Sequence, residues 1–211
     1  MIEITSITEA SNHLQGLEAI IFDLDDTLYG EKEYVRSGFR AITYALPNVE
    51  RMEEKLWQAF EQKKSAIDAV LKAEGIYTDK LKQQCLSVYR LHQPDIQFYE
   101  GAKDLLCQLR TEGYKLGIIT DGRPEGQRAK IKALGLAELI DQIIITDELG
   151  GVECRKPNEK PFGLMRELLG VEYAEMCYVG DNTKKDFIAP DKLGMKSILF
   201  ANKDGLYYQA E

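Results

Sequence analysis

The sequence predicts an α/β fold, an open parallel sheet with helices on its faces and an all-helical segment inserted after the first strand. Short, continuous apolar runs alternate with helical patterns over most of the chain, which is the pattern of a parallel sheet covered on both sides. One long internal region breaks the alternation and carries helical patterns alone. These two observations predict a core domain built from two parts of the chain, with the helical segment inserted between them.

Five segments are predicted to be short buried strands, because each is a compact run of large apolar side chains. Runs without alternation are typical of strands that are buried on both faces. The segments are Glu18–Phe22, Lys115–Thr120, Gln142–Thr146, Met176–Val179 and Lys196–Phe200.

Helical patterns separate these strands. The segments Phe98–Glu112, Pro124–Leu134 and Pro161–Leu169 carry apolar side chains at helical spacing. Strand and helix therefore alternate along the second half of the chain, as an open α/β sheet requires. The residues before Leu17 carry no pattern that assigns them to an element.

Residues 31–95 show helical patterns and no strand pattern. Helices that simply cover the sheet would also explain them, but so many helical residues in a row do not fit one crossover connection. We interpret 31–95 as a helical cap domain, and 1–30 with 96–211 as the α/β core domain. A second helix within the cap is expected at Thr78–Leu91.

Composition excludes some classes of function. The formal net charge is -8 and the Lys and Arg residues are scattered, so nucleic acid is not an expected partner. No apolar run is long enough to span a membrane, and the first residues do not resemble a signal peptide. Four cysteines without C-x-x-C spacing indicate reduced thiols in a cytoplasmic protein. The sequence does not distinguish a monomer from a homodimer.

Polar side chains follow the strands at the edge where an open parallel sheet binds ligands. Carboxylates follow the first strand, beginning at Asp23, and the fourth, beginning at Asp181. Thr120 ends the second strand, and Lys156 lies in the loop after the third. Gathered carboxylates repel one another, and a hard divalent cation with oxygen ligands relieves that repulsion. The arrangement therefore predicts a divalent-cation site, and Mg²⁺ is the common choice where a substrate phosphate completes the ligand shell.

The first acidic pair is weak evidence when taken alone. Asp23 and Asp25 after a strand are as consistent with a solvated turn or a helix cap as with chemistry. The second pair, Asp181 and Asp186, follows a later strand of the same sheet and strengthens the chemical interpretation.

Together these motifs resemble the haloacid dehalogenase superfamily, in its branch with a helical cap between the first two motifs. All four motifs occur in order, each after a predicted strand, and they span Asp23 to Asp186. The resemblance implies a Rossmann-like core and a Mg²⁺-dependent phosphatase acting on a small phosphorylated metabolite. An acid at Asp25 favours phosphatases over dehalogenases, in which this position is not acidic.

The resemblance also implies a role for each matching residue. Asp23 would attack phosphorus and form an aspartyl-phosphate, and Asp25 would serve as general acid and then as general base. Thr120 and Lys156 would complete the catalytic set. The expected phosphate-binding residues are Thr120, Asp121, Gly122 and Lys156. The expected metal ligands are Asp23, Asp25 through its main-chain carbonyl, Asp181 and Asp186.

One position departs from the family pattern. Asp121 stands where the family usually has Asn, and a carboxylate beside a bound phosphate is unfavourable unless it is paired. We expect Asp121 to pair with Arg123 or a cap residue, or to contact a substrate hydroxyl. The choice of Lys156 over Lys160 rests on the Pro157 that follows it.

Three functions remain open at this point. The first is a phosphatase for a sugar phosphate, a nucleoside monophosphate or phosphoglycolate, with a sugar phosphate favoured by resemblance to capped sugar-phosphate phosphatases. The second is a phosphomutase, which would return the phosphoryl group to its substrate. The third is a non-catalytic regulatory protein on the same fold. Neither the dinucleotide-binding nor the P-loop glycine motif is present.

Overall fold

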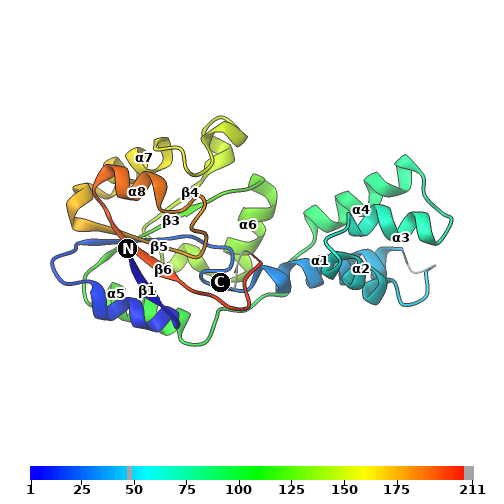
Figure 1. Ribbon diagram of the computed structural model, residues 1–211, viewed down its shortest axis with the longest axis horizontal. Helices are drawn as coiled ribbons and strands as arrows, with labels where there is room; N and C mark the ends of the chain where they lie inside the picture. The colour runs from blue at the N-terminus through cyan, green and yellow to red at the C-terminus, as the bar shows by residue number, and fades with distance from the viewer. Residues whose placement is uncertain (47–48, 207–211) are drawn as a thin grey trace. The chain divides into compact units, whose positions relative to one another are not determined.

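The computed structural model describes residues 1–46 and 49–206, and the chain forms two compact units (Figure 1). The first unit comprises Met1–Glu31 and Gln97–Glu211, and the second comprises Lys32–Ile96. The first holds all the strands of the described residues, and the second is helical. Each unit has its own buried core and is described separately.

A six-stranded parallel sheet organises the first unit, so the predicted α/β class is confirmed. Its strand order is β1-β6-β5-β2-β3-β4. The strands are β1 (Ile2–Ile4), β2 (Ala19–Phe22), β3 (Lys115–Thr120), β4 (Gln142–Ile145), β5 (Met176–Gly180) and β6 (Lys196–Phe200). All five predicted segments form strands, with ends that differ by at most one residue. The short edge strand β1 was not predicted.

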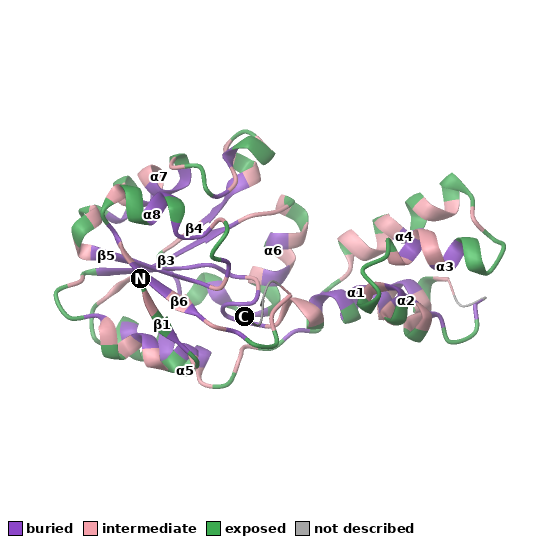
Figure 2. Ribbon diagram, viewed as in Figure 1, coloured by how far each residue is buried: buried purple, intermediate pink, exposed green. Residues whose placement is uncertain are grey.

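The centre of the sheet is its most buried part. Every residue of β2 and β5 is buried, and these two strands pair directly with each other (Figure 2). β2 also pairs with β3 on its other side. The carboxyl ends of these three neighbouring strands therefore lie together, where the side chains that follow them meet.

Helices cover both faces of the sheet (Figure 1). Side chains of α7 and α8 share one apolar cluster with the central strands, and α5 packs on β3 and against the η1 turn. The helices are α5 (Ala102–Thr111), α6 (Pro124–Ala133), α7 (Lys160–Leu169) and α8 (Ile188–Leu193). Short 3₁₀ segments are η1 (Ile7–His13), η2 (Leu136–Glu138), η3 (Thr146–Leu149), η4 (Val152–Cys154) and η5 (Tyr173–Glu175).

The second unit is a group of helices around a separate apolar core. Leu56 and Leu71 are buried in that core, and the hydroxyl of Thr78 caps the fourth helix by accepting from the Leu81 main-chain N–H at 3.1 Å. The helices are α1 (Glu31–Ala45), α2 (Met52–Glu61), α3 (Ala66–Ala73) and α4 (Asp79–Leu91).

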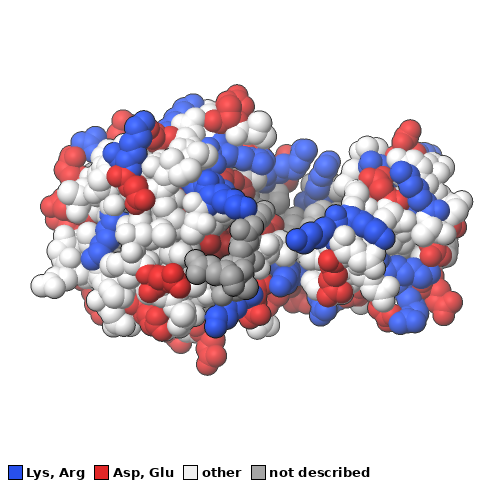
Figure 3. Space-filling view, in the orientation of Figure 1, with Lys and Arg blue, Asp and Glu red and all other residues white. Residues whose placement is uncertain are grey.

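The described helices include none that is both long and apolar enough to cross a membrane. Lys, Arg, Asp and Glu side chains are interspersed on the face drawn in Figure 3. All four cysteines are unpaired, and three of them, Cys85, Cys154 and Cys177, are buried. Burial raises the pKa of the Cys177 thiol to about 12, so this residue is a packing group and not a nucleophile.

Candidate active site

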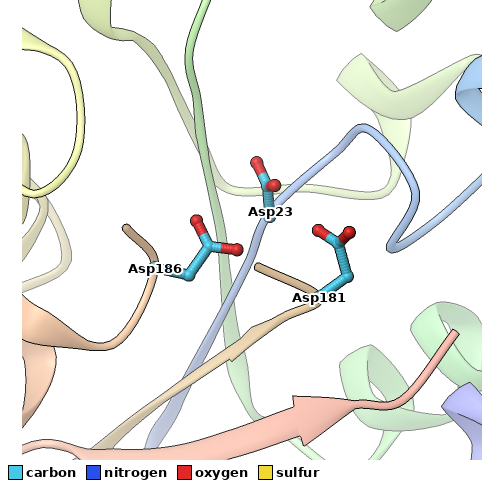
Figure 4. A group of neighbouring side chains, drawn as sticks. All are labelled: Asp23, Asp181 and Asp186. Carbon is cyan, nitrogen blue, oxygen red and sulfur yellow. The ribbon is translucent and has the colours of Figure 1, made fainter. Parts of the chain in front are cut away.

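Three carboxylates meet at the carboxyl ends of β2 and β5 (Figure 4). Asp23 follows β2, Asp181 follows β5, and Asp186 returns from the next loop, with carboxylate oxygens of all three within 4.8 Å of one another. The Asn182 main-chain N–H donates to Asp186 at 3.0 Å and holds it there. A Cβ at Gly180 would lie 2.6 Å from an Asp186 oxygen, so this approach requires glycine.

The acidic group has the properties of a divalent-cation site. Burial is the main factor that raises the pKa of Asp23, to about 6, and the negative charge of Asp186 adds to it. Burial also raises the pKa of Asp181 to about 9, with further contributions from Asp23 and Asp186. Oxygen ligands that resist ionisation together fit Mg²⁺, whose charge would relieve their repulsion. The Asp25 side chain lies outside this group.

Lys156 is the cation beside Asp23. Its Nζ lies 2.7 Å from Asp23 Oδ1 and 2.9 Å from Asp186 Oδ1, and it donates to the Tyr178 hydroxyl at 2.8 Å. Burial opposes the charge of Lys156, but Asp186 and Asp23 hold its pKa well above the ordinary lysine value. The other candidate, Lys160, donates instead to the Leu149 carbonyl. A fixed positive charge therefore touches the predicted nucleophile.

Asp25 is held in a separate network. Its Oδ1 lies 2.6 Å from Lys130 Nζ and accepts from the Tyr29 hydroxyl, and its Oδ2 accepts from Gln127 Nε2 at 2.8 Å. Burial acts to raise the pKa of Asp25, but the charge of Lys130 and the hydrogen bonds lower it below the ordinary value. Asp25 is therefore a carboxylate in this state, two residues from Asp23.

Thr120 and Gly122 lie where β3 leads into α6. Thr120 is fully buried, and its Oγ1 lies 2.5 Å from Gln127 Nε2. Gly122 has φ +143°, a conformation that side chains rarely adopt, and a Cβ there would press on Gln127 at 3.2 Å. The loop thus brings the Thr120 hydroxyl and the first turn of α6 to the same edge of the sheet.

Asp121 is paired, as expected, but Arg123 is the wrong partner, and a contact with a cap residue or a substrate hydroxyl stays a prediction. Its Oδ1 accepts from the Thr146 hydroxyl at 2.9 Å and from the Lys156 main-chain N–H at 3.1 Å, and its Oδ2 lies 3.2 Å from Lys185 Nζ. Arg123 is exposed and is not among these partners. The reason is the sheet order, because β4 adjoins β3 and brings Thr146 beside Asp121.

Four residues of this site were not predicted from the sequence: Tyr178, Lys185, Gln127 and Lys130. The last two did leave a detectable pattern. They lie three residues apart, on the buried side of α6, where helical spacing expects apolar residues. Polar residues at such positions are a sign of paired, functional side chains. Tyr178 lies within an apolar strand and left no comparable pattern.

Comparisons with known proteins identify the family. A profile of haloacid dehalogenase-like hydrolases matches residues 20–200. A glyceraldehyde 3-phosphate phosphatase of Methanopyrus kandleri is 29% identical over 197 residues, which cover 86% of this chain and 83% of that protein. The pyrophosphatase PpaX of Halalkalibacterium halodurans is 27% identical over 193 residues, covering 86% and 82% respectively.

A solved structure shares the fold. The HAD hydrolase YfnB of Bacillus subtilis, crystallised with magnesium bound, superposes with a TM-score of 0.64 at 21% identity, covering 87% of this chain and 86% of that one. The profile match extends over most of the chain and includes both acidic motifs, with Asp23 and Asp186 inside it. The chain belongs to the haloacid dehalogenase-like hydrolase family.

Proposed function

We propose that this hydrolase is a Mg²⁺-dependent phosphatase that cleaves a small phosphomonoester through an aspartyl-phosphate on Asp23. One observation carries the proposal: Asp23 contacts Lys156 and belongs to a group of three carboxylates, with Asp25 two residues away on the same loop. Phosphoryl transfer depends on positioning and on neutralising charge, and this edge of the sheet offers both.

The names of the relatives narrow the substrate class. Proteins similar to this chain are named for glyceraldehyde 3-phosphate and for pyrophosphate, both small phosphorylated compounds. We therefore propose a small sugar phosphate as the first substrate to test, with pyrophosphate as the second. Nucleoside monophosphates and phosphoglycolate complete the set.

In the first half-reaction, Asp23 attacks the phosphorus atom. A bond forms between its carboxylate oxygen and phosphorus, while the bond between phosphorus and the ester oxygen breaks. The electron pair of that bond stays on the leaving oxygen, which takes a proton from the carboxyl of Asp25. Asp25 is a carboxylate in the substrate-free protein, and the negative charge of the bound phosphate raises its pKa so that it takes up this proton from solvent. Lys156, which contacts Asp23, and Thr120, which is linked to Asp25 through Gln127, would hold the phosphoryl oxygens.

In the second half-reaction, water replaces Asp23 on phosphorus. Asp25 removes a proton from the attacking water, the new P–O bond forms, and the bond to Asp23 breaks with its electron pair returning to the Asp23 carboxylate. Asp25 is thereby reprotonated for the next cycle, and inorganic phosphate leaves. Lys156 neutralises charge on Asp23 in both halves.

The metal would be held by Asp23, Asp181 and Asp186, together with the main-chain carbonyl of Asp25. When bound, Mg²⁺ supplies positive charge that neutralises phosphoryl oxygens and orients them for in-line displacement. The chain's own residues provide every proton transfer in the proposed cycle.

The helical unit, Lys32–Ile96, is proposed to be the cap that admits small substrates and excludes bulk water during turnover. Unpaired cysteines are consistent with the proposed cytoplasmic location. A phosphomutase would share Asp23 and Asp25, and a product assay separates it from a phosphatase. A regulatory protein without activity is less consistent with a site in which every catalytic position is filled.

The test is phosphate release from small sugar phosphates, pyrophosphate, nucleotides and p-nitrophenyl phosphate, with Mg²⁺ or with EDTA. We expect metal-dependent release by the wild type and none by Asp23→Asn, with the exposed Asp104→Asn as the matched control. An isomerised phosphosugar without free phosphate would identify a mutase. The absence of both would contradict the proposal.

A further inference from the structure

The inner side of α6 carries two polar residues in place of an apolar stripe. Gln127 and Lys130 are 3% and 4% exposed, and they are the two buried residues of this helix. Burying an amide and an ammonium group costs free energy unless each finds partners. The direction in which these side chains point therefore requires an explanation beyond packing.

Gln127 connects two residues of the site. Its Nε2 lies 2.8 Å from Asp25 Oδ2 and 2.5 Å from Thr120 Oγ1. One amide thus fixes the separation between the predicted acid–base residue and the predicted phosphate-binding hydroxyl. Gly122 makes room for it, because any side chain at that position would press on Gln127.

Lys130 holds the other oxygen of the same carboxylate. Its Nζ lies 2.6 Å from Asp25 Oδ1, which also accepts from the Tyr29 hydroxyl. The ammonium group lies 5.9 Å from the centre of the Tyr29 ring. The side chain of Asp25 is therefore held at both oxygens by groups on α6, a helix distant from it in sequence.

We propose that Gln127 and Lys130 are positioning residues that set the orientation of Asp25 for proton transfer in both half-reactions. The inference rests on the proposed phosphatase function and deepens it. Neither residue lies among the three carboxylates or touches Asp23 in the described contacts, so neither acts on the nucleophile directly. They affect catalysis through Asp25, so kinetic experiments can separate their effect from an effect on the nucleophile Asp23.

The leaving group of the substrate decides which half-reaction depends on Asp25. A nitrophenolate leaves without protonation, so its release in the first turnover does not need a well-placed Asp25. Hydrolysis of the phosphoenzyme needs Asp25 for any substrate, because water must be activated. An alkyl leaving group, as in glycerol phosphate, needs Asp25 in the first half-reaction as well.

The experiment uses rapid-mixing kinetics on the wild type, Lys130→Met, Gln127→Met and the control Lys132→Met, an exposed lysine on the same helix. With p-nitrophenyl phosphate, we expect Lys130→Met to keep the first-turnover burst within about twofold and to lower steady-state turnover by about 10–100-fold. With glycerol phosphate, single-turnover cleavage itself should slow by about the same factor. Gln127→Met should show the same pattern with a smaller loss, and the control should match the wild type.

Two results would overturn this inference alone. One is wild-type kinetics in both variants, and the other is equal slowing of the burst and the steady state in both. Circular dichroism checks that each variant is folded. If Lys130→Met does not fold, Gln127→Met provides the same kinetic test. If the wild type itself releases no phosphate, the proposed function fails and this inference fails with it.

Discussion

Two sets of buried acids occupy the same edge of the sheet, and they differ in how their charge is balanced. Asp23, Asp181 and Asp186 form one group, and Lys156 is in direct contact with two of them, Asp23 and Asp186. Asp25 has a cation of its own and hydrogen bonds to both oxygens. The pKa of Asp23 and Asp181 is raised, chiefly by burial, whereas the pKa of Asp25 is lowered despite burial.

The difference indicates that the first set is suited to bind a metal ion and that the second is suited to hold one side chain in place. The first set has more carboxyl groups than neighbouring cations, so Asp181 stays protonated until a divalent ion adds positive charge. The second is already balanced within the protein, which suits a side chain that must stay in one orientation. Substitution of one acid from each set should therefore change stability in opposite directions.

Asp25→Asn, a substitution in the second set, should cause the largest loss of activity. We expect turnover of alkyl phosphates to fall by about 10²–10⁴-fold, because acid–base catalysis is lost. The free energy of unfolding should fall by about 2–3 kcal/mol, because the buried ammonium group of Lys130 loses the carboxylate that lies 2.6 Å from it. Steady-state kinetics and urea unfolding measure the two. A variant as stable as the wild type would show that the Lys130 pair contributes little.

Asp181→Asn should have the opposite effect on the metal-free protein. Burial keeps the Asp181 carboxyl protonated in the folded state, whereas the unfolded chain ionises it freely. Asn has no proton to lose in either state, so we expect the free energy of unfolding in EDTA to rise by about 1–2 kcal/mol. The concentration of Mg²⁺ that half-saturates activity should rise at least about tenfold. Thermal unfolding with and without Mg²⁺ tests both, since Mg²⁺ should stabilise the wild type and not the variant. Loss of stability in EDTA would contradict this account of the acidic set.

The gain from Asp181→Asn should also depend on pH. The wild type holds a proton on Asp181 when folded, with a pKa of about 9 against 3.8 in the unfolded chain. The folded state thus binds more protons between these values, and wild-type stability falls as pH rises through that range. Unfolding in EDTA at two pH values inside this window should show a larger gain at the higher pH. An unchanged gain would contradict the raised pKa.

Gly122→Ala tests how Gln127 holds Asp25 in the second set. A Cβ at φ +143° is strained and presses on Gln127, so we expect a loss of about 1–3 kcal/mol in stability. Turnover should fall with the pattern of Gln127→Met, with the nitrophenolate burst preserved. Gly113→Ala is the matched control, because it also has positive φ but no atom within 4 Å of the added Cβ. Equal effects of the two would assign the loss to backbone strain alone.

Tyr178→Phe should give the smallest effect. It removes the hydrogen bond that Lys156 donates to the hydroxyl and the one that the hydroxyl donates to the Ile119 carbonyl, while Lys156 keeps its contacts with Asp23 and Asp186. We expect stability to fall by about 1–2 kcal/mol and turnover to fall by less than tenfold. Chemical denaturation and steady-state kinetics measure these changes. A loss as large as that of Asp25→Asn would show that Tyr178 does more than hold Lys156.

The sequence predicted the parts of the fold that have a strong pattern. Continuous apolar runs located β2 to β6, because most residues of these strands are buried whichever face they lie on. The first strand, Ile2–Ile4, is three residues at the sheet edge and too short to form a pattern. The second unit was expected to be helical, and its described elements are α1 to α4.

The site divides in a similar way. Residues directly after strands were found by position, because topology brings strand ends together. Partners such as Lys130 and Lys185 come from a helix face and a loop, and sequence spacing does not show which carboxylate they reach. Asp121 illustrates this limit, since its partner is 64 residues away at Lys185 and not the nearby Arg123. Long-range side-chain pairing required the structure.

Mass spectrometry of enzyme quenched by acid during turnover tests most directly whether Asp23 is the nucleophile. We expect a covalent phosphoryl adduct on the peptide that contains Asp23, present in the wild type and enriched in Lys130→Met. It should be absent in Asp23→Asn and in wild type without substrate. An adduct on another residue, or phosphate release at full rate by Asp23→Asn, would contradict the claim that Asp23 is the nucleophile.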